Sequence, residues 1–116
     1  MKYFVSYTSR DKEITSAFLN NYFHILRKDG DVFIDIIHND SLNKQERVFN
    51  ELDMCDIFIL IESENVYKSE WVLLEIERAS KLKKKIIKIS LESLKESLAI
   101  RQLSATAIMD CRGIVE

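Results

Sequence analysis

Short apolar runs alternate with helical patterns five times along this 116-residue chain, and this alternation limits its fold more than any other feature. One run, Asp56–Ile61, is almost wholly apolar, as is typical of a strand that is covered on both faces of a sheet. Alternating strands and helices favour a parallel sheet with helices on both faces. We therefore expect an α/β domain of the flavodoxin-like type, with a doubly wound, five-stranded parallel sheet in the order 2-1-3-4-5.

The individual elements follow from residue type and spacing. β-Branched and aromatic runs predict strands at Tyr3–Tyr7, Val32–Ile37, Asp56–Ile61, Ile86–Ile89 and Ala107–Met109. Helical spacing of apolar residues predicts a first helix, capped by Asp11, that carries Ile14, Phe18, Tyr22, Ile25 and Leu26. Further helices are predicted around Val48–Leu52 with Ser41 or Asn43 as the cap, from Glu70 to Lys83, and from Leu91 to Leu98.

Composition narrows the class of protein. No repeat, linker or low-complexity tract divides the chain, so residues 1–116 are expected to form one domain. The 17 basic and 19 acidic residues give a net charge of −2, which argues against nucleic acid or an anionic membrane as a partner. No apolar run approaches the ~20 residues of a membrane span, and no signal peptide is evident, so a soluble cytoplasmic domain is expected.

Several kinds of chemistry are disfavoured. The sequence has two glycines, too few for the glycine-rich phosphate loops of dinucleotide and triphosphate folds. Neither its two histidines nor its two cysteines have metal-ligand spacing, so we expect no metal and no resident cofactor. Cys55 and Cys111 flank apolar runs and are expected to be buried thiols.

The predicted topology indicates where a ligand binds. In a doubly wound sheet the ligand lies beyond the carboxyl ends of the strands, at the switch point between strands 1 and 3. The segments Ser6–Arg10, Asp35–Leu42 and Ser63–Ser69 leave the first three strands there. Arg10 could pair with a pyrophosphate, although a single loop arginine is more often only solvated. Ser63, Tyr67 and Ser69 could hydrogen-bond a ribose or phosphate, or could serve as turn residues, with Ser69 as a helix cap.

Glu75 is the strongest single candidate. It follows Trp71 by one helical turn, so the two side chains share a face beside the loop that leaves the third strand. Partial burial there would raise its pKa and prepare it for a cationic or hydroxyl-rich ligand. The alternative is a surface glutamate on an amphipathic helix.

Three blocks taken together resemble one family. They are Phe4-Val5-Ser6-Tyr7 with Asp11, then Phe33-Ile34-Asp35, then Ser63 to Trp71 followed after three residues by Glu75. This order is similar to that of the Toll/interleukin-1 receptor (TIR) domain family over about residues 2–90. The resemblance implies a flavodoxin-like fold and places Glu75 at the family's catalytic glutamate. It is strongest to small stand-alone bacterial members, such as those of Thoeris-like anti-phage defence.

The resemblance also implies an activity, in which NAD is a substrate and not a cofactor. Members of this kind cleave NAD at the nicotinamide–ribose bond and release nicotinamide with ADP-ribose or a cyclic isomer, which a separate effector protein can sense. Glu75 would stabilise the developing charge, and Tyr7 and Trp71 would shape the pocket. The ribose and pyrophosphate would be held by Ser6, Arg10, Asp35, Ser63, Tyr67 and Ser69.

Two departures and two alternatives accompany this interpretation. Val72 stands where the family often has cysteine, and the loop His38–Leu42 lacks the family's Pro-Gly. That loop mediates subunit contacts in the family, so self-association is expected through it. The alternatives are a non-enzymatic interaction module and an enzyme similar to nucleoside deoxyribosyltransferases, which use a glutamate as a covalent nucleophile.

Overall fold

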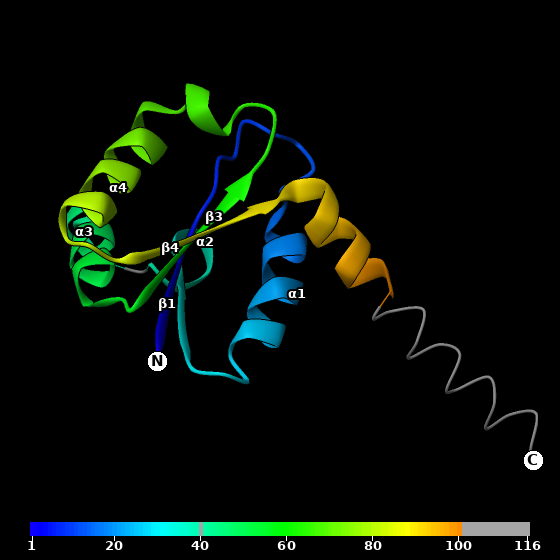
Figure 1. Cartoon of the computed structure of the whole chain (residues 1–116), viewed down its shortest axis with the longest axis horizontal. Coiled ribbons are helices and arrows are strands. Elements are labelled where there is room, and N and C mark those ends of the chain that lie inside the picture. The colour runs from blue at the N-terminus through cyan, green and yellow to red at the C-terminus, as the bar shows by residue number, and fades with distance from the viewer. Residues whose placement is uncertain (40, 101–116) are drawn as a thin grey trace, which may run out of the picture.

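The computed structural model describes residues 1–39 and 41–100 (Figure 1). Strands and helices alternate in it, and residues 91–100 form a last helical stretch after the final strand. The elements are β1 (Lys2–Ser6), α1 (Ser16–Leu26), β2 (Asp31–Ile34), α2 (Asp35–His38), α3 (Lys44–Met54), β3 (Ile57–Glu62), the 3-10 turn η1 (Val66–Lys68), α4 (Glu70–Lys81) and β4 (Lys85–Ser90).

The four strands of the described residues form one parallel sheet in the order β2-β1-β3-β4. Phe4 in β1 is level with Phe33 in β2 and with Phe58 in β3, so three aromatic rings stack across the sheet. This order confirms the predicted parallel α/β arrangement, with its switch point between β1 and β3. The predicted fifth strand, Ala107–Met109, and Cys111 lie outside the described residues.

Helices cover both faces of the sheet (Figure 1). On one face the strand side chains Phe4, Phe58 and Leu60 pack with Val48 of α3 and Val72 of α4. The other face carries a second cluster, in which strand residues pack against α1 and the helical stretch 91–100. β3 is buried on both faces, as its apolar run predicts, because it is a central strand with neighbours on both edges.

The predicted start of the first helix was wrong. α1 begins at Ser16 and is capped by Thr15, whose Oγ1 accepts a hydrogen bond from Phe18 N at 3.1 Å. Asp11 is therefore not the cap, although Ile14 is buried as its spacing predicts. Cap preference alone could not separate the two residues, because aspartate and threonine are both good caps.

β2 is shorter than predicted. It ends at Ile34, and the next four residues form the short helix α2. Asn39 follows this helix, and its N–H donates to Asp35 O at 3.0 Å. Ile36 is consequently half-exposed instead of lying in a strand. An apolar run of this length does not by itself distinguish a strand from a helical turn.

The later helices agree more closely with the sequence. Asn43, one of the two candidate caps, caps α3 by accepting a hydrogen bond from Glu46 N. α4 begins at Glu70 as predicted but ends at Lys81, two residues early, because Lys83 takes a positive φ of 57°. Lys84 N then donates to Ala79 O at 3.0 Å, which closes the helix end. Within the described residues, none of these helices has the length and apolar character needed to cross a membrane.

Candidate active site

Glu75 is buried in α4 and leaves 4 % of its surface exposed. Ser6, the last residue of β1, is also buried, and its Oγ donates a hydrogen bond to Glu75 Oε1 at 2.8 Å. No described residue forms an ion pair with Glu75. A glutamate on the surface of an amphipathic helix, the alternative that the sequence left open, is therefore ruled out for this position.

The surroundings of Glu75 favour its neutral form. Burial raises the pKa of Glu75 to about 7, and the negative charge of Asp35 adds to the shift, while the Ser6 hydroxyl and the Trp71 indole oppose it. Burial also raises the pKa of Tyr7 to about 12, so this phenol stays neutral. Glu75 is thus an acid that can change its charge near neutral pH, as is typical of functional sites.

A cavity of about 440 Å³ opens at the carboxyl ends of the strands, where the topology places a ligand. Its walls come from the segments after β1 and β2, the first residue of α3 and the first turns of α4. It is lined by Phe4, Val5, Tyr7, Thr8, Ser9, Arg10, Asp35, Ile36, Lys44, Ser69, Trp71 and Glu75. Two cations, two carboxylates and three aromatic rings therefore border one space of the size of a small-molecule site.

Six of the nine predicted site residues line this cavity: Tyr7, Arg10, Asp35, Ser69, Trp71 and Glu75. Ser6 is the seventh that belongs to the site, through its hydrogen bond to Glu75. Ser69 meets both interpretations of its sequence position, because its Oγ also caps α4 by accepting from Val72 N at 3.3 Å. Trp71 packs on Phe49 with ring centroids 5.3 Å apart, which fixes its ring in the wall.

The other two predicted residues do not line the cavity. Tyr67 lies in η1 and is 46 % exposed, and its hydroxyl donates a hydrogen bond to Glu62. The Ser63 hydroxyl is buried near Asp11 and makes no hydrogen bond to a described residue. The nearby Ser63 hydroxyl and the hydrogen bonds from Asn65 hold the pKa of the Asp11 carboxyl below its usual range. Asp11 thus joins the loops after β1 and β3 at the rim, and its Oδ1 accepts from Asn65 Nδ2 at 2.6 Å.

Several lining residues were missed from the sequence. Thr8 and Ser9 fall inside the predicted segment 6–10, but hydroxyls are common in loops and carried no signal of their own. Lys44 reaches the cavity from the start of α3, and only the fold brings that position near Glu75. No group of histidine, cysteine, aspartate or glutamate side chains in residues 1–39 and 41–100 is arranged to hold a metal ion.

The fold and the site define a parallel α/β domain with a buried acid beside a cavity at its switch point. The chain matches the TIR domain family over residues 4–113, and it therefore belongs to that family. TIR domains include NAD-cleaving enzymes and signalling scaffolds, and they self-associate. A comparison with curated proteins finds no match.

Proposed function

We propose that this protein is an enzyme that cleaves NAD at the bond between nicotinamide and ribose. The observation that carries the proposal is Glu75, a buried carboxyl at the cavity with a hydroxyl partner and no cation paired to it among the described residues. A structural carboxylate is normally paired, because an unpaired buried charge is costly. A ligand that brings its own positive charge would relieve this cost.

The cavity offers complementary groups for the two ends of NAD. Glu75 and Asp35 would face the cationic nicotinamide ribose, and Arg10 would face the pyrophosphate. Tyr7 and Trp71 supply apolar surface that excludes water. The proposed ligands of the ribose and phosphate include Ser6 and Ser69. Ser63 and Tyr67 remain proposed ligands too, although they lie at the rim and do not line the cavity.

The chemistry makes a small demand on the protein. Nicotinamide leaves as a neutral molecule from a cationic glycosidic nitrogen, so no general acid is needed. The bond between C1′ and that nitrogen breaks with its electron pair on nitrogen, and positive charge develops on the ribose as in glycoside cleavage. The Glu75 carboxylate stabilises this charge and accepts hydrogen bonds from the ribose hydroxyls. Water, or the adenine of the same molecule, then bonds to C1′ and loses a proton, which gives ADP-ribose or a cyclic isomer.

Two further expectations accompany the proposal. Self-association is proposed through the loop His38–Leu42, whose Leu42 side chain is fully exposed. A cyclic product would act on a separate effector protein, as in the bacterial anti-phage systems whose TIR proteins this chain resembles.

The test is incubation of concentrated protein with NAD, with the products resolved by mass spectrometry. Wild type should release nicotinamide, and Glu75→Gln should lose about a hundred- to a thousandfold in rate because it lacks the stabilising charge. Glu77→Gln, an exposed change on the same helix, is the matched control and should keep full activity. Equal rates for wild type and Glu75→Gln would contradict the proposal. Absence of turnover over a wide range of protein concentrations would favour the interaction module, and a ribosyl adduct on Glu75 would favour the transferase alternative.

A further inference from the structure

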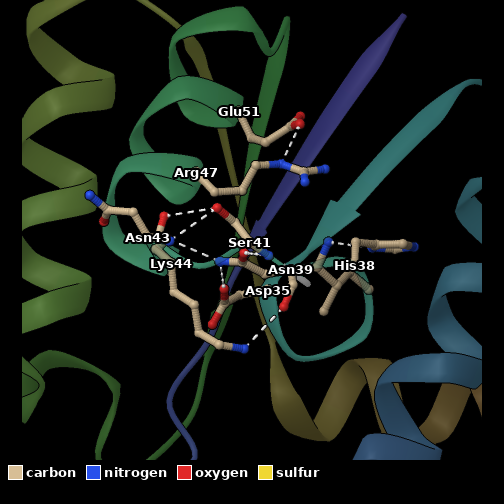
Figure 2. A network of polar contacts seen from close by, with 9 residues as sticks. Asp35, His38, Asn39, Ser41, Asn43, Lys44, Arg47 and Glu51 are labelled. Atoms are coloured by element: carbon tan, nitrogen blue, oxygen red, sulfur yellow. Dashed lines mark hydrogen bonds and ion pairs between the residues drawn. The ribbon is translucent and has the colours of Figure 1, made fainter.

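Asn39 is a buried polar residue with no part in the proposed reaction. It follows α2 and is 7 % exposed. Its Nδ2 donates to Asp35 Oδ1 at 2.6 Å and to Lys44 O at 3.0 Å, and its Oδ1 accepts from Ser41 N at 3.2 Å (Figure 2). A buried amide whose donors and acceptor are all engaged has one orientation, because any rotation would leave polar atoms without partners.

The backbone of Asn39 holds the same two neighbours. Its N–H donates to Asp35 O at 3.0 Å, and its carbonyl accepts from Lys44 Nζ at 3.1 Å. Asp35 and Lys44 both line the cavity of Glu75. One buried residue therefore contacts both a carboxylate and an ammonium of the cavity wall, as Figure 2 shows for the segment from α2 to the start of α3.

The position of Asp35 matters to Glu75 because its charge acts on the buried acid. After burial, the Asp35 carboxylate is the second influence that raises the pKa of Glu75. A carboxylate free to rotate toward water would act less strongly on Glu75, because solvent screens it. The titratable and charged side chains that share the cavity with Glu75 are Tyr7, Arg10, Asp35 and Lys44.

We propose that Asn39 is a positioning residue, whose buried amide fixes the Asp35 carboxylate in the wall of the Glu75 cavity, where its charge acts on Glu75 and on the ligand. The consequence for turnover rests on the proposed NAD cleavage. The consequence for the titration of Glu75 does not, so the two can fail separately.

The variant that tests this is Asn39→Ser. A serine hydroxyl can still accept from Ser41 N as a local turn, but it is too short to reach Asp35. Asn65→Ser is the matched control, since Asn65 Nδ2 donates to another carboxylate, that of Asp11, at the same 2.6 Å outside the cavity. Asp35→Asn shows the effect of removing the charge altogether.

The primary measurement is the titration of the Glu75 carboxyl carbon by NMR in protein labelled at glutamate. We expect its midpoint to fall by about half a pH unit in Asn39→Ser and by at least as much in Asp35→Asn, and to stay at the wild-type value in Asn65→Ser. In the rate of NAD cleavage, Asn39→Ser should lower kcat roughly tenfold and change KM less, because the wall is displaced. If neither the wild type nor any variant cleaves NAD, the proposed function fails. The titration of Glu75 then still decides the role of Asn39.

A wild-type midpoint in Asn39→Ser would overturn the inference, whether or not Asp35→Asn moves it. If Asn39→Ser does not fold, a second measurement uses the wild type and Asp35→Ala. The Asn39 side-chain amide protons should exchange slowly with water in wild type and faster in Asp35→Ala. Rapid exchange in wild type, or equal rates in the two proteins, would overturn the inference equally.

Discussion

Helix α4 carries two charged side chains one turn apart whose surroundings differ completely. Glu75 is buried at the cavity and has a serine hydroxyl as its hydrogen-bond partner. Arg78 lies on the part-exposed side of the same helix. It donates two hydrogen bonds to the Asp53 carboxylate, from Nε at 2.6 Å and from Nη2 at 2.7 Å. Its guanidinium also lies over the Phe49 ring, 4.7 Å from the centroid.

The pKa values of the Glu75 and Asp53 carboxyls are shifted in opposite directions. Burial raises the pKa of Glu75 to about 7, whereas the hydrogen bonds from Arg78 hold the pKa of Asp53 below its usual range. The Asp53–Arg78 contact joins the end of α3 to α4, and at neutral pH each of its charges has a partner. The surroundings of Glu75 instead disfavour its charged form. The comparison separates a carboxylate that holds the fold together from one that is prepared for chemistry.

The largest expected effect concerns the stability of Glu75→Gln. Because the pKa is raised from 4.5 to about 7, the folded state holds a proton there that the unfolded state has released, and the free energy of unfolding falls as pH rises through this window. The fall amounts to on the order of 3 kcal/mol for a shift of this size. Glu75→Gln should lack it and be the more stable protein at pH 8, as measured by urea unfolding from pH 4 to pH 8. The same slope in both proteins would show that Glu75 does not take up a proton on folding.

Ser6→Ala should give an intermediate effect. The Ser6 hydroxyl favours the charged form of Glu75, so its removal should raise the pKa of Glu75 further and move the pH profile of NAD cleavage alkaline by about one pH unit. Ser80→Ala, an exposed change on α4, is the control and should leave the profile in place. A shift toward acid would mean that the hydroxyl does not act on the charged form.

Arg78→Met should give the smallest effect, and it should destabilise the protein where Glu75→Gln stabilises it. It removes the partner of Asp53, so it should lower the melting temperature slightly at neutral pH, where Asp53 is charged. The difference should disappear in acid, because the stability due to a lowered carboxyl pKa is lost as that carboxyl takes up its proton. The effect is small because the two side chains are 41 % and 37 % exposed and water screens the pair. Melting curves at neutral pH and near pH 3 would check it.

The sequence predicted the sheet better than its connections. The apolar run of β3 and the alternation around it indicated a central parallel strand, because burial on both faces requires such a run. The turn after β2 was not predictable in this way, since Ile36 and Ile37 continue an apolar pattern while Asp35 and Asn39 close a helical turn. Local hydrogen bonds of this kind depend on neighbours that a linear pattern does not rank.

The site was predictable where its residues lie close together in the chain. Ser69, Trp71 and Glu75 share one cap and one helix face, so their spacing alone brings them to one place. Lys44 enters only through the fold, which brings the start of α3 to the cavity. Asn39 enters through local hydrogen bonds to Asp35 and Lys44, which spacing alone does not predict. Tyr67 was predicted at the site because it lies near Ser69 and Trp71 in sequence, but its hydroxyl is turned toward Glu62 and does not line the cavity.

The raised pKa of Glu75 has a consequence for any positively charged ligand. Because this pKa lies near 7, the protonated and charged forms of the carboxyl coexist around neutral pH, and a cation that enters the cavity favours the charged form. Binding is therefore an exchange, in which the ligand's charge arrives and a proton departs into the buffer. The measured heat of binding should then vary with the ionisation enthalpy of the buffer, and a slightly acidified compartment would weaken binding without any change in the shape of the cavity.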